Sequence, residues 1–259
     1  MSGNEATHIV NGTVVNQGTL KDSGGSPLSR GRILFQVEGA EVYYRDIEIK
    51  PVEATGTEPE GTGRITLFNG DNTSAWEPKK SGGTLWPIND GAFEVLAGAT
   101  IGANDVRTKQ TFKDFKLHLE FQVPSSPAGT PEQGRGNSGV YLQGRYELQI
   151  LDSYKRALSG KNDAGAIYGI KDASKNVSRA PGVWQSYDVT FRAARYSAGR
   201  KTASARVSVY WNGTLVQNNV TIPRATTLGA PEGSSAGPIV LQDHRHAVRY
   251  RNIWLQPLD

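Results

Sequence analysis

The sequence predicts an all-β protein, a sandwich or jelly roll built from two packed antiparallel sheets. Three observations support this fold class. The 259 residues include 30 glycines and 13 prolines, which favour many tight turns. The segment FKLHLEFQV at 115–123 alternates apolar and polar side chains, which is the pattern of a half-buried strand. The sequence also lacks any convincing amphipathic helix longer than about two turns.

Further segments have the short, β-rich character of strands separated by turns. They are 64–68, 92–96, 138–143, 146–151, 186–192, 205–211, 214–220, 238–243 and 247–256. The dipeptides Asn212-Gly213 and Asn11-Gly12 supply residues that accept the positive φ angles of a type I′ turn. We therefore expect a β-hairpin at each of these two places.

A partial internal repeat lies near the start of the chain. Residues 31–51 align without a gap to residues 237–257, with 8 of 21 positions identical. Such self-similarity indicates a repeated structural unit, and chance likeness between β-rich segments is the alternative. We divide the chain into closing strands of a partial repeat at 1–51, a polar linker at 52–63 and a main domain at 64–259. The first segment is either the end of a preceding domain or a duplicated tail.

Residues 1–51 are too few to bury a core of their own, because a small set of short strands is marginal in water. Their apolar side chains, among them Ile33 and Phe35, must therefore pack against another surface. We expect extra strands docked on the main domain, or exchanged between the protomers of a homo-oligomer.

Composition narrows the classes of partner. The net charge of +4 comes from Lys and Arg spread along the chain, without the basic and aromatic stripe that indicates nucleic-acid binding. The absence of cysteine excludes disulfides, thiol chemistry and cysteine-ligated zinc. No apolar run approaches the ~18 residues of a membrane span. The start, MSGNEATHIV, lacks the charged and apolar regions of a signal peptide.

Polar side chains gather on one face of two adjacent predicted strands. Glu147 and Gln149 share a face of the second strand, and Tyr141 and Gln143 of the first strand join them there. Asp152 lies just past the second strand, close enough to contribute. A solvated sheet face would explain a lone Glu-x-Gln pair, but it normally carries a mixture of Lys, Glu and Thr. This face is therefore a candidate binding or catalytic surface.

A predicted strand near the C-terminus repeats this theme, because Gln242 and His244 alternate with its apolar residues. Histidine titrates in the range that suits acid–base catalysis, and a hydrogen-bonded structural role is equally compatible with one sequence. The irregular stretch 152–182 is long enough to cover a sheet face. We expect Tyr168 and Lys171 of this stretch to contribute to substrate binding.

Tryptophans and motifs give weaker signals. Large aromatic side chains can form a sugar-stacking platform, although in a β-sandwich they more often fill the core. The candidates are Trp76, Trp86, Trp184 and Trp254.

Metal-binding, P-loop and Rossmann motifs are absent from the sequence. We therefore expect no metal site from a known motif and no cofactor, while a metal requirement stays open.

Several blocks in order carry a family resemblance. They include LFNGDNTSAW at 67–76, GNSGVYLQ at 136–143, YELQILD at 146–152 and GPIVLQDHRHAVRYRNIWLQPL at 237–258. With these blocks, residues 64–259 resemble the bacterial 3-keto-disaccharide hydrolase domain, formerly a domain of unknown function, which has a concanavalin-like jelly-roll fold. Arg245 departs from the glycine usual after the histidine, and Gln185 from a usual asparagine.

The resemblance implies cleavage of glycosides already oxidised to a ketone at C3, by a bacterial protein of the periplasm or the extracellular space. A C3 ketone acidifies the hydrogen on C2, so a base can remove it and the C1 substituent leaves by β-elimination. Water then adds to the enone. Glu147, Asp152 and His244 would serve as base and acid in these steps.

Amide side chains would stabilise the developing enolate in this reaction, and Asn137, Gln143 and Gln149 are the expected donors. Tyr141, Tyr168, Lys171 and Gln242 complete the expected contacts with an oligosaccharide or glycoside. The alternative is a lectin-like carbohydrate-binding module without catalysis, possessing the same fold. Such a module would tolerate the loss of Glu147 or His244, whereas an enzyme would not.

Overall fold

The structure is a computed structural model that describes residues 5–10, 13–19 and 63–258. The chain splits into two compact units, residues 1–62 and 63–259. In the first unit, β1 (Glu5–Val10) pairs antiparallel with β2 (Thr13–Thr19).

The predicted turn at Asn11-Gly12 lies between these two strands but outside the described residues, as does the repeat copy at 31–51. The expected docking or exchange of residues 1–51 therefore stays a prediction.

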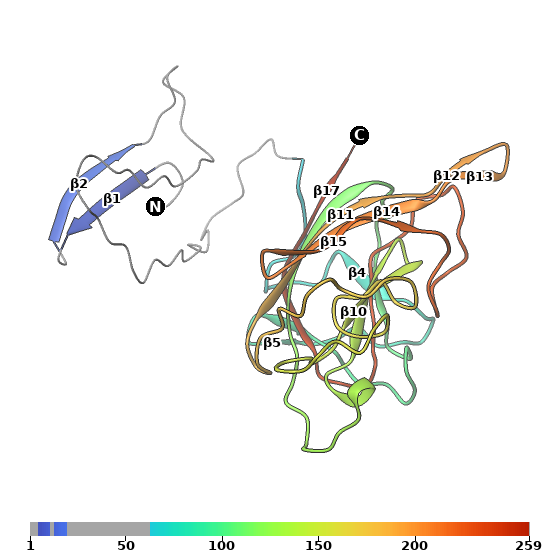
Figure 1. The fold of residues 1–259 in the computed structure, drawn as a ribbon, viewed down its shortest axis with the longest axis horizontal. Coiled ribbons are helices and arrows are strands. Elements are labelled where there is room, and N and C mark those ends of the chain that lie inside the picture. The colour runs from blue at the N-terminus through green and yellow to red at the C-terminus, as the bar shows by residue number, and fades with distance from the viewer. Residues whose placement is uncertain (1–4, 11–12, 20–62, 259) are drawn as a thin grey trace. The chain divides into compact units, whose positions relative to one another are not determined.

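The second unit is a sandwich of two antiparallel sheets, with one short 3-10 helix, η1 (Glu132–Gly134) (Figure 1). The smaller sheet has the order β10 (Tyr146–Ile150), β9 (Ser138–Leu142), β16 (Val240–Leu241), β7 (Val106–Thr108) and β4 (Trp76–Pro78). Strand β10 is one edge of this sheet. No helix in the described part of the chain is long and apolar enough to cross a membrane.

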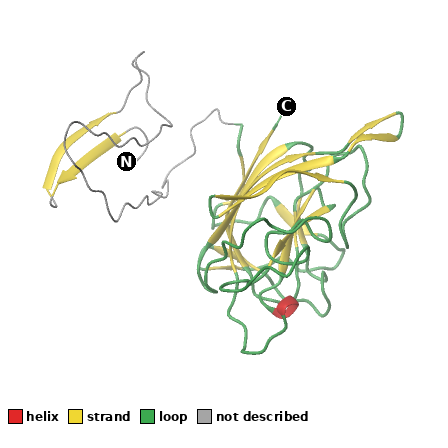
Figure 2. Cartoon of the chain, viewed as in Figure 1, coloured by secondary structure: helices red, strands yellow, loops and turns green. Residues whose placement is uncertain are grey.

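The larger sheet has eight strands. Its order is β15 (Thr214–Ile222), β14 (Ala205–Trp211), β11 (Gln185–Arg192), β8 (Phe115–Gln122), β17 (Arg249–Pro257), β6 (Ala92–Glu94) and β5 (Ile88–Asn89), with β3 (Ile65–Phe68) also paired to β17. A separate two-stranded ribbon consists of β12 (Arg195–Ser197) and β13 (Arg200–Ala203). Strands are the main regular structure of the second unit, and long loops join them (Figure 2).

The core lies between the two sheets. Alternate residues of β8 are buried, including Leu117 and Leu119, as the period of two predicted. Hydrogen bonds cross the core, among them one from the Tyr187 hydroxyl to the Gln149 carbonyl at 2.8 Å and one between the hydroxyls of Ser138 and Tyr250, which lie 2.7 Å apart. Because buried hydroxyls need partners, these bonds tie the two sheets together at a defined position.

The all-β sandwich predicted from the sequence is confirmed. At the predicted hairpin turn, Asn212 and Gly213 have φ angles of 50° and 77°, as a type I′ turn requires. Sequence analysis missed five strands of two to four residues, β4, β5, β7, β12 and β13. Strands this short have too few residues to show a period of two.

The four tryptophans do not form one stacking platform. Trp76 and Trp86 are buried in the core at 1% and 2% exposure. The Arg251 guanidinium lies over Trp184, 4.2 Å from the ring centroid, and that of Arg64 lies over Trp254 at 4.0 Å. Two are therefore core residues, and the other two have a ring face covered by arginine.

Candidate functional site

The site is built on the outer face of the smaller sheet, where β9 and β10 lie side by side. Glu147 of β10 is opposite Tyr141 of β9, and Gln149 is opposite Gly139. Their neighbours in the strands, such as Leu148, are in the core. Because side chains alternate between the two faces of a strand, the apolar residues fix which face carries the polar ones.

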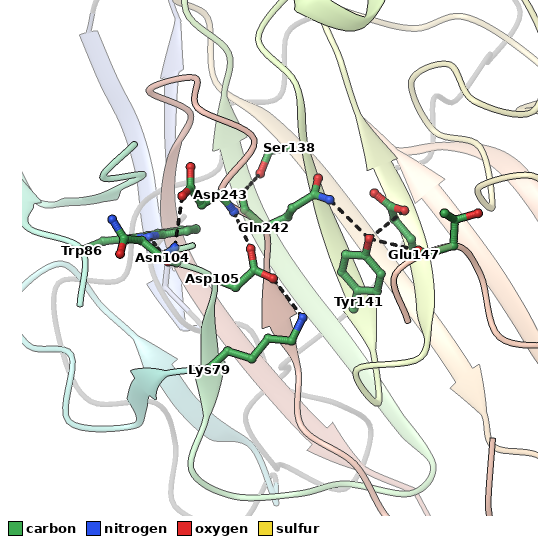
Figure 3. Close-up of polar contacts among 10 residues, drawn as sticks. Lys79, Trp86, Asn104, Asp105, Ser138, Tyr141, Glu147, Gln242 and Asp243 are labelled. Atoms are coloured by element: carbon green, nitrogen blue, oxygen red, sulfur yellow. Dashed lines mark hydrogen bonds and ion pairs between the residues drawn. The ribbon is translucent and has the colours of Figure 1, made fainter. Parts of the chain in front are cut away.

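The Glu147 carboxylate is held by neighbours on the adjacent strands. The Tyr141 hydroxyl donates to its Oε2 at 2.9 Å, and Gln242 Nε2 donates to that hydroxyl at 3.3 Å (Figure 3). Gly139 leaves the space that the carboxylate occupies, because a Cβ atom there would lie 2.5 Å from Glu147 Oε1. The sequence therefore provides both a hydrogen-bond partner and a gap for this side chain.

Two loops attach to the free edge of β10 through the backbone of Glu147 itself. The Glu147 N–H donates to Thr226 Oγ1 at 2.9 Å, and the Glu147 carbonyl accepts the N–H of Tyr168 at 3.1 Å. Two residues further along β10, the Gln149 carbonyl accepts the N–H of Gly165 at 3.0 Å. These loops cover the sheet face, and only 4% of Glu147 remains exposed.

Burial controls the acidity of Glu147. It raises the pKa of the carboxyl from 4.5 to about 8, although the hydrogen bond from Tyr141 opposes the rise. The Asp105 carboxylate raises this pKa further, while the Lys79 ammonium lowers it. Figure 3 shows Lys79 in contact with Asp105, with Nζ and Oδ2 2.9 Å apart. At pH 7 the Glu147 carboxyl is therefore mostly protonated.

His244 lies in the turn that follows β16, and it lines the same cavity as Glu147. Burial lowers its pKa below 6.5, and the neighbouring His246 lowers it further, so the imidazole is neutral at pH 7. The preceding residue, Asp243, is fully buried and anchors the turn: its carboxylate accepts the backbone N–H groups of Gly98, Asn104 and Arg245.

A cavity of about 290 Å³, part of it open to solvent, lies over this face. Its lining residues come from both strands, both loops and the C-terminal turn. They are Gln133, Asn137, Glu147, Gln149, Tyr168, Thr227, Leu228, Gln242 and His244. The structure therefore brings together Glu147 and Gln149 of one predicted strand with Gln242 and His244 of the other.

The amide groups of Asn137 and Gln242 have a free oxygen in the cavity, whereas the Gln149 oxygen accepts the Ile150 N–H at 3.2 Å. Asn137 Nδ2 donates to the Gln133 carbonyl at 2.9 Å, and Gln149 Nε2 donates to the Asn162 carbonyl at 3.3 Å. The side-chain oxygens of Asn137 and Gln242 are buried without a hydrogen-bond partner. Asn137 Nδ2 also lies 3.3 Å from Gln133 Oε1, so its N–H groups already bind the protein. Gln149 Nε2 has a second N–H, so its role as a donor to an enolate stays a prediction.

Three residues expected in the site lie elsewhere. Gln143 has a φ of 55° in the turn after β9, and its Nε2 donates to the Phe112 carbonyl at 2.9 Å. The Asp152 carboxylate is buried in an ion pair with Arg135, with Oδ2 and Nη2 2.6 Å apart. The exposed Lys171 pairs with neighbouring Asp172. None of the three lines the cavity.

The structure adds loop residues that sequence analysis did not select, namely Gln133, Thr227 and Leu228 in the cavity lining and Thr226 beside it. They are separated from Glu147 by long stretches of chain, and nothing in their local pattern indicates a site. The one available signal was the length of the Pro- and Gly-rich loop at 124–137, which contains Gln133.

Comparison with known proteins places the chain in a family. The family model described as the 3-keto-alpha-glucoside-1,2-lyase-like domain matches residues 63–256. The chain belongs to this family. Its fold is the concanavalin-like jelly-roll sandwich that the sequence predicted. Among proteins with curated functions, none matches the chain.

Solved structures agree with this family assignment. A proposed glycosyl hydrolase from Parabacteroides distasonis ATCC 8503 is 34% identical, with a TM-score of 0.69, over 93% of this chain and 100% of that one. That match extends beyond 63–259 into the first unit. A second such protein from the same organism is 20% identical, with a TM-score of 0.55, over 76% of this chain and 94% of that one, which shows the fold alone.

The family assignment and the first of these structures support a carbohydrate-active function for the chain. The described residues contain no group of three or more His, Asp or Glu side chains placed to hold a metal ion. Glu147 and His244 supply a carboxyl and an imidazole to the cavity, and the other lining residues are Gln, Asn, Tyr, Thr and Leu.

Proposed function

We propose that the second unit cleaves 3-keto-glycosides by removing the proton on C2 and eliminating the substituent on C1, followed by addition of water. The observation that carries this proposal is that the Glu147 carboxyl and the His244 imidazole line one cavity, where burial moves their pKa values in opposite directions. Glu147 is protonated at pH 7 and His244 is neutral. Environments that push two pKa values apart assign one group as acid and the other as base.

The two groups divide the elimination between them. The neutral His244 imidazole accepts the proton from C2, and the electrons of the C2–H bond form an enolate with the C3 carbonyl. When the C3 carbonyl re-forms, a C1–C2 double bond forms and the C1–O bond breaks. Glu147 gives its proton to the departing oxygen, which leaves as an alcohol.

Hydration reverses these roles and restores both groups. The Glu147 carboxylate takes a proton from water as the water oxygen bonds to C1, and the His244 imidazolium returns its proton to C2. The product is a 3-keto-sugar. Buried acceptors also suit this substrate, because the free side-chain oxygens of Asn137 and Gln242 can accept hydrogen bonds from sugar hydroxyls.

The test distinguishes the acid from the base by measuring how the effect of each substitution on kcat depends on the leaving group. We expect Glu147→Gln to lower kcat by about 10²–10⁴-fold for an alkyl 3-keto-glucoside, and far less for a nitrophenyl one, whose departure needs little acid. We expect His244→Asn to lower both rates and to abolish exchange of the C2 hydrogen with deuterium from solvent. Glu77→Gln makes the same chemical change on β4 at a partly exposed position outside the cavity, where Glu77 pairs with Arg107, and serves as the control.

The pH dependence follows from the same assignment. For the parent protein, kcat/KM should fall above about pH 8 as Glu147 ionises, and on the acid side as His244 protonates, at a lower pH than for an ordinary histidine because burial lowers the His244 pKa. Equal losses for both leaving groups in Glu147→Gln would refute the acid role. A parent protein that binds 3-keto-disaccharides by calorimetry but cleaves none would instead be the non-catalytic binding module.

A further inference from the structure

An exposed leucine in an unusual backbone conformation stands at the mouth of the cavity. Leu228 lines the cavity and is 68% exposed, and its φ is 62°, in the left-handed region. This conformation is strained for an L-residue with a side chain. An apolar side chain in contact with water and a strained backbone both need a structural reason or a functional one.

The surrounding turn holds Leu228 in this position. The Thr226 N–H donates to the Arg145 carbonyl at 3.0 Å, and the Gly229 N–H donates to the Thr226 carbonyl at 3.0 Å. A Cβ atom on Gly229 would lie 2.2 Å from the Arg145 carbonyl oxygen, so this contact requires glycine. The Ala230 N–H donates to the Gly144 carbonyl at 2.8 Å. The turn is thus clamped onto the β9–β10 hairpin with the Leu228 side chain outward.

Tyr168 lines the cavity from the other loop. Its backbone N–H binds the Glu147 carbonyl, and the Glu147 N–H binds Thr226, two residues before Leu228. Tyr168 and Leu228 are therefore presented by loops anchored to the same residue, which is the one that protonates the leaving oxygen in the proposed reaction. Whatever is attached to that oxygen must pass close to these two loops.

The size and charge of the cavity restrict what that group can be. The cavity is small, because its empty volume of about 290 Å³ includes open solvent, so it encloses no more than one sugar ring. The C1 substituent must then extend through the mouth. Apart from Glu147 and His244 every lining side chain is uncharged, so a charged substituent would find no ionic partner among them.

We propose that Tyr168 and Leu228 form a leaving-group subsite that selects an apolar substituent, an alkyl or aryl group, on the departing oxygen. This inference rests on the proposed function. Contact with such a group removes the Leu228 side chain from water, which compensates for its exposure in the free protein. The preferred substrates are therefore 3-keto-glycosides of apolar alcohols, ahead of those whose leaving group is a small or strongly hydrated alcohol.

The experiment compares two substrates, cyclohexylmethyl and methyl 3-keto-glucoside. Their leaving alcohols have similar acidity, so the C1–O bonds break with similar ease and the substrates differ in the apolar surface of the leaving group. Leu228→Asn is the test variant, because asparagine accepts a left-handed backbone and removes the apolar surface. Tyr210→Asn is the control: Tyr210 is 45% exposed on β14 of the other sheet and does not line the cavity. The measured quantity is the ratio of kcat/KM for the two substrates.

We expect the parent protein and Tyr210→Asn to prefer the cyclohexylmethyl substrate by the same ratio, and Leu228→Asn to lower that ratio about tenfold. An unchanged ratio in Leu228→Asn would overturn the subsite. If the parent protein cleaves neither substrate, the proposed function fails, and calorimetric Kd values for the two compounds test the subsite alone. A Kd preference lost in Leu228→Asn would support it, and equal Kd values in the parent would refute it.

Discussion

Removing the buried carboxyl of Glu147 should stabilise the fold at alkaline pH. The pKa of this group is 4.5 in its ordinary environment and about 8 in the folded protein. The folded state therefore binds the proton more tightly than the unfolded state. Its contribution to stability is complete below about pH 4.5, declines as pH rises and is lost above about pH 8. Glu147→Gln cannot ionise and so does not lose this contribution.

The pKa displacement sets the size of the effect. At about 1.4 kcal/mol for each pH unit, it corresponds to at most about 5 kcal/mol. Relaxation around the charged carboxylate reduces this bound, so we expect the free energy of unfolding of Glu147→Gln to gain about 3 kcal/mol over the parent between pH 5 and pH 9. Urea unfolding of both proteins across this range measures the difference, in which groups common to both cancel.

The control for this prediction is again Glu77→Gln, which makes the same change at a partly exposed position of the same sheet, where the carboxylate pairs with Arg107. A stability difference between Glu147→Gln and the parent that does not grow with pH would refute the reasoning. It would mean that water reaches the carboxyl freely, and the argument for Glu147 as an acid at pH 7 would lose its basis.

Two further predictions concern backbone positions beside the site. Gly139→Ala should displace the Glu147 carboxylate, because the new Cβ would lie 2.5 Å from Oε1, and should lower stability by about 1–3 kcal/mol in urea unfolding. Gly233→Ala meets no atom closer than 3.9 Å, and a loss as large in this control would contradict that account. Arg245→Gly should raise the melting temperature slightly, since Arg245 has a φ of 68°. A lower melting temperature would show that its side chain stabilises the turn.

The strand-borne part of the site was predictable from sequence, and the loop-borne part was not. Alternation with buried residues placed Glu147 and Gln149 on one face, because a strand has a period of two. The same rule failed for Gln143, since the strand ends in a turn where its φ is 55° and alternation no longer applies. Asp152 was expected in the site, but its carboxylate pairs with Arg135, which comes from another loop. Such pairings depend on tertiary structure, which no local pattern records.

In the proposed reaction, the edge position of β10 couples the acidity of Glu147 to the selection of the leaving group. An edge strand has unpaired backbone groups, and here those of Glu147 bind Thr226 on one loop and Tyr168 on the other. The loops that satisfy this edge are also the ones that exclude water from the carboxyl and raise its pKa. Relatives with different loops on the same edge should therefore differ both in the acidity of this carboxyl and in the leaving group that they accept.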